Sequence, residues 1–158
     1  MYAGAVRTLG IDYGGRRIGM ALSDATGMLA RPWKTIPRVG NPQQVAAAIA
    51  GEVAALRAES DGLAAVVVGM PRKLSGEPTE HTAAVVALGD ALRHLVDVPV
   101  VLQDERLTSY EADSLLARRE KDWRKRKAQL DAVSAAVILQ DYLDGVPRAT
   151  PDSEGNES

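Results

Sequence analysis

The sequence predicts an α/β fold in which alanine-rich helices cover a sheet. Short apolar or alternating runs, typical of strands, are interspersed with segments whose apolar residues repeat at helical spacing. The 158 residues include no Phe, so the core must be built mainly from Val, Leu, Ile and Ala, which suits a sheet covered by helices. The length, with 46% hydrophobic and 25% charged residues, is typical of one ordinary globular domain.

The first part of the chain is expected to form an antiparallel meander of three strands. Residues 6–13 alternate, with Leu9 and Ile11 on one face and Asp12 on the other. Gly14-Gly15 then turns the chain into a strand over 18–23, and a turn at 25–27 leads to a third strand over 29–36.

Helices and strands are expected to alternate in the rest of the chain. Asn41-Pro42 is a good helix start, and one apolar face continues to about residue 59. A buried strand over 63–68 follows, and then a helix whose apolar face carries Val85, Leu88, Leu92 and Leu95. After a strand over 98–103, a last helix is expected from about Ala128 to Leu143, with Asp131 in its first turn. We expect one domain over 1–145 and a disordered acidic tail over 146–158.

Composition limits the chemistry and the compartment. The absence of Cys excludes disulfides, thiolate zinc sites and a Cys nucleophile. No signal-like N-terminus and no apolar run of membrane-spanning length are present, so we expect a cytoplasmic protein without membrane contact.

Charge is distributed unevenly along the chain. The net charge is −2, yet residues 118–127 hold seven Lys/Arg against two acidic residues, a local charge of +5, which leaves −7 for the rest. Such a run is usually a solvated loop. It could also track the phosphates of a nucleic acid, with Trp123 either stacking on a base or anchoring the loop.

Three acidic motifs are candidates for a Mg²⁺ site. Asp12 lies on the first strand, Asp104-Glu105 follows the last strand, and Asp131 lies near the start of the last helix. Hard divalent cations take oxygen ligands and can drive phosphodiester hydrolysis without Cys, His or Ser nucleophiles. Each residue also has a structural interpretation, as a turn cap, a solvated strand end or a helix-dipole partner. Spacing alone does not show that they meet.

The motifs together resemble the YqgF/RuvX family of pre-16S rRNA nucleases, once described as Holliday junction resolvase-like. They are 12–19 (DYGGRRIG) with 21–24 (ALSD), 69–71 (GMP), 104–108 (DERLT) and 131–143 (DAVSAAVILQDYL). The resemblance covers residues 6–144 approximately. It implies an RNase H-like fold, with a five-stranded mixed sheet, the first three strands antiparallel, and helices on both faces.

The same resemblance implies an acidic triad, Asp12, Glu105 and Asp131, that is both catalytic and metal-binding. The triad would hold Mg²⁺, and Mn²⁺ should substitute because it accepts the same ligands. Arg16, Arg17 and Arg106 flank the acidic motifs and would either bind phosphates or neutralise the carboxylates. The full set expected to bind nucleic acid is Arg16, Arg17, Arg72, Lys73, Arg106, Arg124, Lys125, Arg126 and Lys127.

One stretch of this chain departs from the family pattern. The loop after 69–71 reads Lys73-Leu74-Ser75-Gly76 where the family commonly carries Asn-Met-Asp-Gly, which bears on substrate selectivity more than on the triad. His81 and His94, on the polar surface or flank of the second helix, are interpreted as ordinary surface residues rather than as general bases.

Several functions remain open at this level. The leading one is a metal-dependent endonuclease that processes the 5′ end of 16S rRNA precursor on the assembling small ribosomal subunit. The alternatives are a four-way DNA junction resolvase, which would need a homodimer, and a non-catalytic RNA-binding assembly factor. The hairpin at Asp12 also resembles that of actin-like ATPases and sugar kinases, but those need a second lobe for which 158 residues leave no room.

Overall fold

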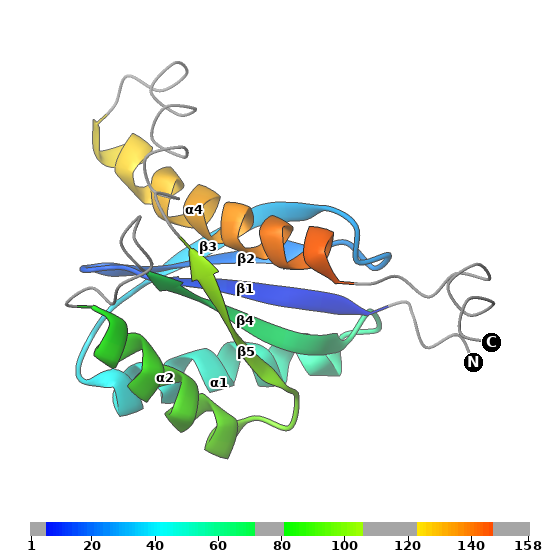
Figure 1. The fold of residues 1–158 in the computed structure, drawn as a ribbon, viewed down its shortest axis with the longest axis horizontal. Coiled ribbons are helices and arrows are strands. Elements are labelled where there is room, and N and C mark those ends of the chain that lie inside the picture. The colour runs from blue at the N-terminus through cyan, green and yellow to red at the C-terminus, as the bar shows by residue number, and fades with distance from the viewer. Residues whose placement is uncertain (1–5, 72–80, 106–122, 147–158) are drawn as a thin grey trace.

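A single five-stranded sheet forms the centre of the molecule (Figure 1). The computed structural model describes residues 6–71, 81–105 and 123–146. The strands are β1 (Arg7–Tyr13), β2 (Arg17–Ser23), β3 (Ala30–Pro37), β4 (Leu63–Pro71) and β5 (Val100–Glu105), in the order β3-β2-β1-β4-β5. The pairs β1–β2 and β2–β3 are antiparallel, whereas β4 is parallel to β1 and β5 is parallel to β4.

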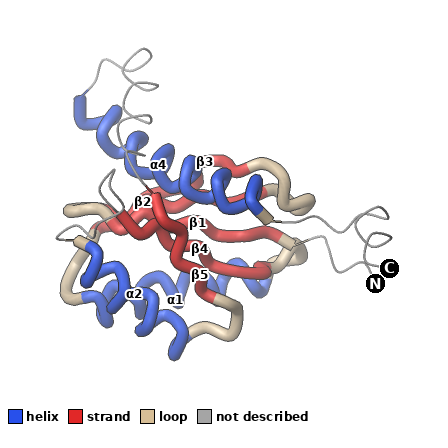
Figure 2. Tube along the Cα trace, viewed as in Figure 1, coloured by secondary structure: helices blue, strands red, loops and turns tan. Residues whose placement is uncertain are grey.

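Helices cover both faces of this sheet (Figure 2). Helices α1 (Pro42–Ala58) and α2 (Thr82–Leu95) pack together on one face, and α4 (Trp123–Gly145) lies on the other. This is the expected RNase H-like architecture, including the antiparallel first three strands. None of the helices in the described part of the chain is long and apolar enough to cross a membrane.

Two cores follow from this layering. The main core lies between the sheet and α1 and α2, where the alternating residues Leu9 and Ile11 are fully buried as the strand period requires. The second core lies under α4 and is built from Ala21, Val67, Ala135, Ile138, Leu139 and Leu143. Burial on both faces explains why β4 is a continuous apolar run.

The last helix begins earlier than the sequence suggested. Its first residue is Trp123 and not Ala128, so residues 124–127 are helical rather than part of a loop. Arg and Lys are good helix formers and no Gly or Pro interrupts the segment, so the helix extends through the charged run. The placement of Asp131 in the first turn was therefore wrong, because Asp131 is the ninth residue of α4. A role as a helix-dipole partner is excluded, since that effect fades beyond the first turn.

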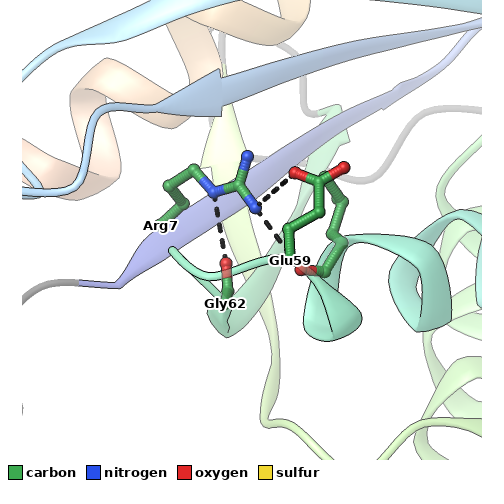
Figure 3. Close-up of polar contacts among 4 residues, drawn as sticks. Arg7, Glu59 and Gly62 are labelled. Atoms are coloured by element: carbon green, nitrogen blue, oxygen red, sulfur yellow. Dashed lines mark hydrogen bonds and ion pairs between the residues drawn. The ribbon is translucent and has the colours of Figure 1, made fainter.

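Arg7 fastens the start of β1 to the end of α1, as Figure 3 shows. Its Nη2 donates to Glu59 Oε1 at 3.0 Å and to the Leu56 carbonyl at 3.4 Å, and its Nε donates to the Gly62 carbonyl at 3.2 Å. One guanidinium thus satisfies carbonyls at and beyond the C-terminal turn of α1, where the helix leaves them without partners. At the other end of α1, Asn41 and Gln44 form a reciprocal capping box, which confirms the helix start expected at Asn41-Pro42.

Candidate active site

Asp12 is the last residue but one of β1 and belongs to the face covered by α4. Leu9, Ile11 and Tyr13 point to the opposite face, where they join the main core. Gly10, two residues before Asp12, lies directly under α4, because a Cβ built on it would be 2.7 Å from Leu139 Cβ. Strand alternation therefore places the Asp12 side chain on the α4 face.

Asp131 reaches the same place from α4. Gly19 is paired with Asp12 across the β1–β2 ladder, and a Cβ at Gly19 would collide with the backbone carbonyl of Asp131. The helix can therefore rest on the strand at this point only because residue 19 has no side chain. The pairing of Asp12 with Gly19, together with the absence of a side chain at Gly19, therefore brings the Asp12 and Asp131 carboxylates into the same region.

The two carboxylates interact electrostatically. The pKa of Asp12 is raised from 3.8 to about 7, first by burial and second by the negative charge of Asp131. Asp12 thus exchanges its proton near neutral pH. A bound cation would oppose both causes of the high pKa, because it offers the carboxylate a positive partner inside the protein.

Arg17 supplies positive charge on the side of Asp131. Its Nε donates to Asp131 Oδ2 at 2.9 Å, and the side chains are 29% and 23% exposed, respectively. Of the two roles considered for Arg17, the structure shows the neutralising one. Arg16, next to it in the hairpin, is exposed.

Glu105 ends β5 on the same face but is separated from the other two carboxylates by β4. Val101 packs under α4, so Gln103 and Glu105 share its face by alternation. Extending the register of β1, β4 and β5 puts Asp12 level with Gln103, and Glu105 lies two residues further along. Because β4 lies between them, the backbones of β1 and β5 are two strand spacings apart, or about 10 Å. Within residues 6–71, 81–105 and 123–146, no three Asp, Glu or His side chains form a group that could hold a metal ion.

His81 was wrongly interpreted as an ordinary surface residue. Its ring stacks on Tyr13, with centroids 5.4 Å apart and an angle of 26° between the planes. Its Nε2 lies 2.8 Å from the Tyr13 carbonyl oxygen. No sequence signal links residues 13 and 81, which belong to different elements. His94 is exposed, as expected.

The basic residues expected to bind nucleic acid are only partly within the described structure. Residues 124–127 occupy the first turns of α4, which rise beyond the sheet at the end where β1 and β4 finish (Figure 1). Asp12 lies at that same end of β1. Arg72, Lys73 and Arg106 lie outside the described residues, as does the 73–76 loop.

Comparison with known proteins places the chain in a family. Residues 6–145 match the model of the RuvX family, which is described as Holliday junction resolvase. The chain belongs to the RuvX family. The matched region ends at Gly145, which is also the last residue of α4.

Relatives of this RuvX-family chain are similar over nearly its whole length. The protein of Chloroflexus aggregans named "Putative pre-16S rRNA nuclease" is 43% identical over 136 residues, covering 86% of this chain and 92% of its own. Proteins with the same name from Anaeromyxobacter dehalogenans and Leifsonia xyli are 41% and 38% identical over 143 and 148 residues. These alignments cover 88% and 94% of this chain, and 97% and 91% of the relatives.

Solved structures similar to this RuvX-family chain are distant in sequence. Thermus thermophilus RuvC in complex with Holliday junction substrate has a TM-score of 0.49 and 15% identity, covering 87% of this chain and 93% of RuvC. A ROK family glucokinase from Streptomyces griseus has a TM-score of 0.43 and 22% identity, covering 72% of this chain but 36% of the glucokinase.

Proposed function

We propose that this protein is a metal-dependent nuclease that hydrolyses phosphodiester bonds with Asp12, Asp131 and Glu105. The observation that carries the proposal is the pair formed by Asp12 and Asp131, in which burial and a neighbouring negative charge raise the pKa of Asp12 to about 7. Perturbed carboxylates of this kind are typical of functional sites. Membership in the RuvX family and the names of the relatives support the same reaction class.

The donor set fits a divalent cation such as Mg²⁺, with Mn²⁺ as a substitute. Mg²⁺ is commonly held by one or two carboxylates, with water and substrate phosphates completing its shell. Asp12 and Asp131 offer two such carboxylates on one face of the sheet. Glu105, at the end of β5 and separated from them by β4, is the third acidic residue that we propose for the site. When bound, the cation would supply Lewis acidity for attack on a phosphate.

The remaining side chains would prepare the site for a phosphate. Arg17 holds Asp131 in place by its 2.9 Å contact, and its guanidinium has further N–H groups that could donate to a phosphate oxygen. The first turns of α4 would contribute Arg124 to Lys127 as sequence-independent contacts to the backbone of the nucleic acid. Arg16 is exposed and would add another such contact.

The substrate we favour is the 16S rRNA precursor, cut at its 5′ end in the cytoplasm on the assembling small ribosomal subunit. The relatives named for pre-16S rRNA support this choice. A four-way DNA junction is the second candidate, because the family is described as Holliday junction resolvase. Cutting a symmetric junction would require a homodimer.

Cleavage assays distinguish these functions. Labelled 16S precursor RNA and a synthetic four-way DNA junction are incubated with Mg²⁺ or Mn²⁺ and with wild type, Asp12→Asn or Asp131→Asn. Asp97→Asn is the matched control, since it removes a carboxylate that is 86% exposed and paired with Arg57. We expect metal-dependent cutting of the RNA that both site substitutions abolish and the control retains. Cutting that survives Asp12→Asn would contradict the proposed site, and cutting of the junction alone would select the second function.

A further inference from the structure

The ring of Tyr13, the residue after Asp12, is contacted by the side chains of His81, just before α2, and Arg38, just after β3. Tyr13 is 2% exposed. His81 stacks on its ring, and the guanidinium carbon of Arg38 lies 4.2 Å from the ring centroid. Its phenol oxygen is buried and has no hydrogen-bond partner among the described residues. A buried hydroxyl without a partner is unfavourable, whereas the ring stacking and the cation–π contact are favourable interactions of the same side chain.

The same two side chains hold the backbone that follows Asp12. The Tyr13 carbonyl is 2.8 Å from His81 Nε2, and the Gly14 carbonyl accepts from Arg38 Nη1 at 3.0 Å. The Gly14 amide donates to the carbonyls of Asp12 and Arg17 at 3.0 and 3.1 Å. The three consecutive backbone carbonyls of Asp12, Tyr13 and Gly14 therefore each have a hydrogen-bond partner.

The contact with Tyr13 determines the tautomer of His81. A carbonyl oxygen can only accept, so Nε2 must carry the proton and donate it. His81 immediately precedes the first residue of α2, and its side chain makes no capping bond to that helix. The ring reaches instead to the end of β1, and so links α2 to the strand that carries Asp12.

The held backbone faces the carboxylate pair. A Cβ at Gly14 would be 3.9 Å from Asp131 Oδ1, so the turn that His81 and Arg38 fix passes directly beside Asp131. A shift of this turn would change the separation of Asp12 and Asp131. An error of about 1 Å in such geometry can cost about a hundredfold in rate.

We propose that His81 is a positioning residue that, through the Tyr13 carbonyl, holds the Asp12 carboxylate in register with Asp131. Arg38 supports it through its contact with the Tyr13 ring and its hydrogen bond to the Gly14 carbonyl. The proposal rests on the proposed nuclease function for its kinetic readout, but the positioning itself is a statement about backbone geometry and can be measured without activity.

The test compares His81→Ala and His81→Gln with wild type. The Gln side chain can place an N–H near the position of Nε2–H, whereas Ala cannot. His94→Ala is the matched control, because His94 also contacts a backbone carbonyl through its ring, Nδ1 to Asp90 at 2.9 Å, but is exposed on the far end of α2. We measure kcat and KM on the RNA substrate, and hydrogen exchange at the Gly14 amide.

The proposal predicts a loss of kcat of about 10- to 100-fold in His81→Ala with KM changed less than about twofold. His81→Gln should recover most of the loss, and His94→Ala should match wild type. The Gly14 amide should exchange about tenfold faster in His81→Ala only, while core amides keep their protection. Unchanged kcat or unchanged Gly14 exchange in His81→Ala would overturn the proposal.

A separate readout covers the case in which the wild type cuts no nucleic acid. That result would defeat the proposed function, but positioning would still be testable by the rise in Tm that Mn²⁺ produces. The rise should be smaller in His81→Ala than in wild type and His81→Gln. An equal rise in all three proteins would overturn the positioning role.

Discussion

Replacing Asp12 by Asn should change how the stability of the protein depends on pH. The pKa of Asp12 is 3.8 when unperturbed and about 7 in the folded protein, so the folded state binds more protons than the unfolded state between these values. The free energy of unfolding of wild type therefore decreases as pH rises from about 4 to about 7. Asn has nearly the same shape and cannot ionise, so this part of the decrease should disappear in Asp12→Asn.

The magnitude follows from the two pKa values. A difference of about three pH units corresponds to about 4 kcal/mol at the full effect. Partial exposure of the site and relaxation of its surroundings reduce that value, so we expect Asp12→Asn to be more stable than wild type by about 2–4 kcal/mol at pH 8.5. Near pH 4 the two proteins should differ little, since Asp12 is then protonated when folded.

Urea unfolding at a series of pH values, with divalent cations removed, measures this difference. Asp61→Asn makes the same charge change at an exposed position and serves as the control. Adding Mg²⁺ should then stabilise wild type at pH 8.5 but not Asp12→Asn. The reasoning is refuted if Asp12→Asn is no more stable than wild type at pH 8.5, or if its advantage is the same at pH 4.

Three further predictions concern the surroundings of the site. Gly19→Ala should push α4 away from β2, lowering the free energy of unfolding by about 1–3 kcal/mol and abolishing cleavage, as urea unfolding and the cleavage assay would show. Asp24 has a lowered pKa, mainly because Thr26 donates to it, so its contribution to stability is present at neutral pH and lost in acid; Asp24→Asn should therefore be destabilised at pH 7 and equal to wild type near pH 2 in thermal melts. Reversing residues 124–127 to Glu should weaken RNA binding and flatten its salt dependence in titrations, without reducing Mn²⁺ binding.

The fold was largely predictable because its signals are local. The alternation through Leu9 and Ile11 and the Gly14-Gly15 turn define the first hairpin, and the apolar run at 63–68 defines a strand buried on both faces. The start of α4 was missed because a run of like charges is usually solvated coil, whereas here helix propensity extends the helix through it. Leu95 was assigned to the apolar face of α2 but is 51% exposed, because α2 ends there.

From residue spacing alone, the candidate site was predictable only as separate residues, and it was the family resemblance that implied a triad. Asp12 and Asp131 could be selected by type and position, but their meeting depends on the pairing of Asp12 with Gly19 and on the contact of Gly19 with α4. Neither this pairing nor this contact can be predicted from the residue spacing within a single strand or helix. The contact between His81 and the Tyr13 carbonyl is a tertiary contact of the same kind, and no periodicity points to it.

The outer edge of the sheet has a consequence for assembly. β3 is an edge strand that contains Pro32 and Pro37, which have no N–H to offer a neighbouring chain, and its register with β2 shifts between Met20 and Ala21. Prolines and such irregularities are the devices by which proteins prevent edge-to-edge pairing. The β3 edge is therefore poorly suited to joining the sheets of two copies of this chain into one.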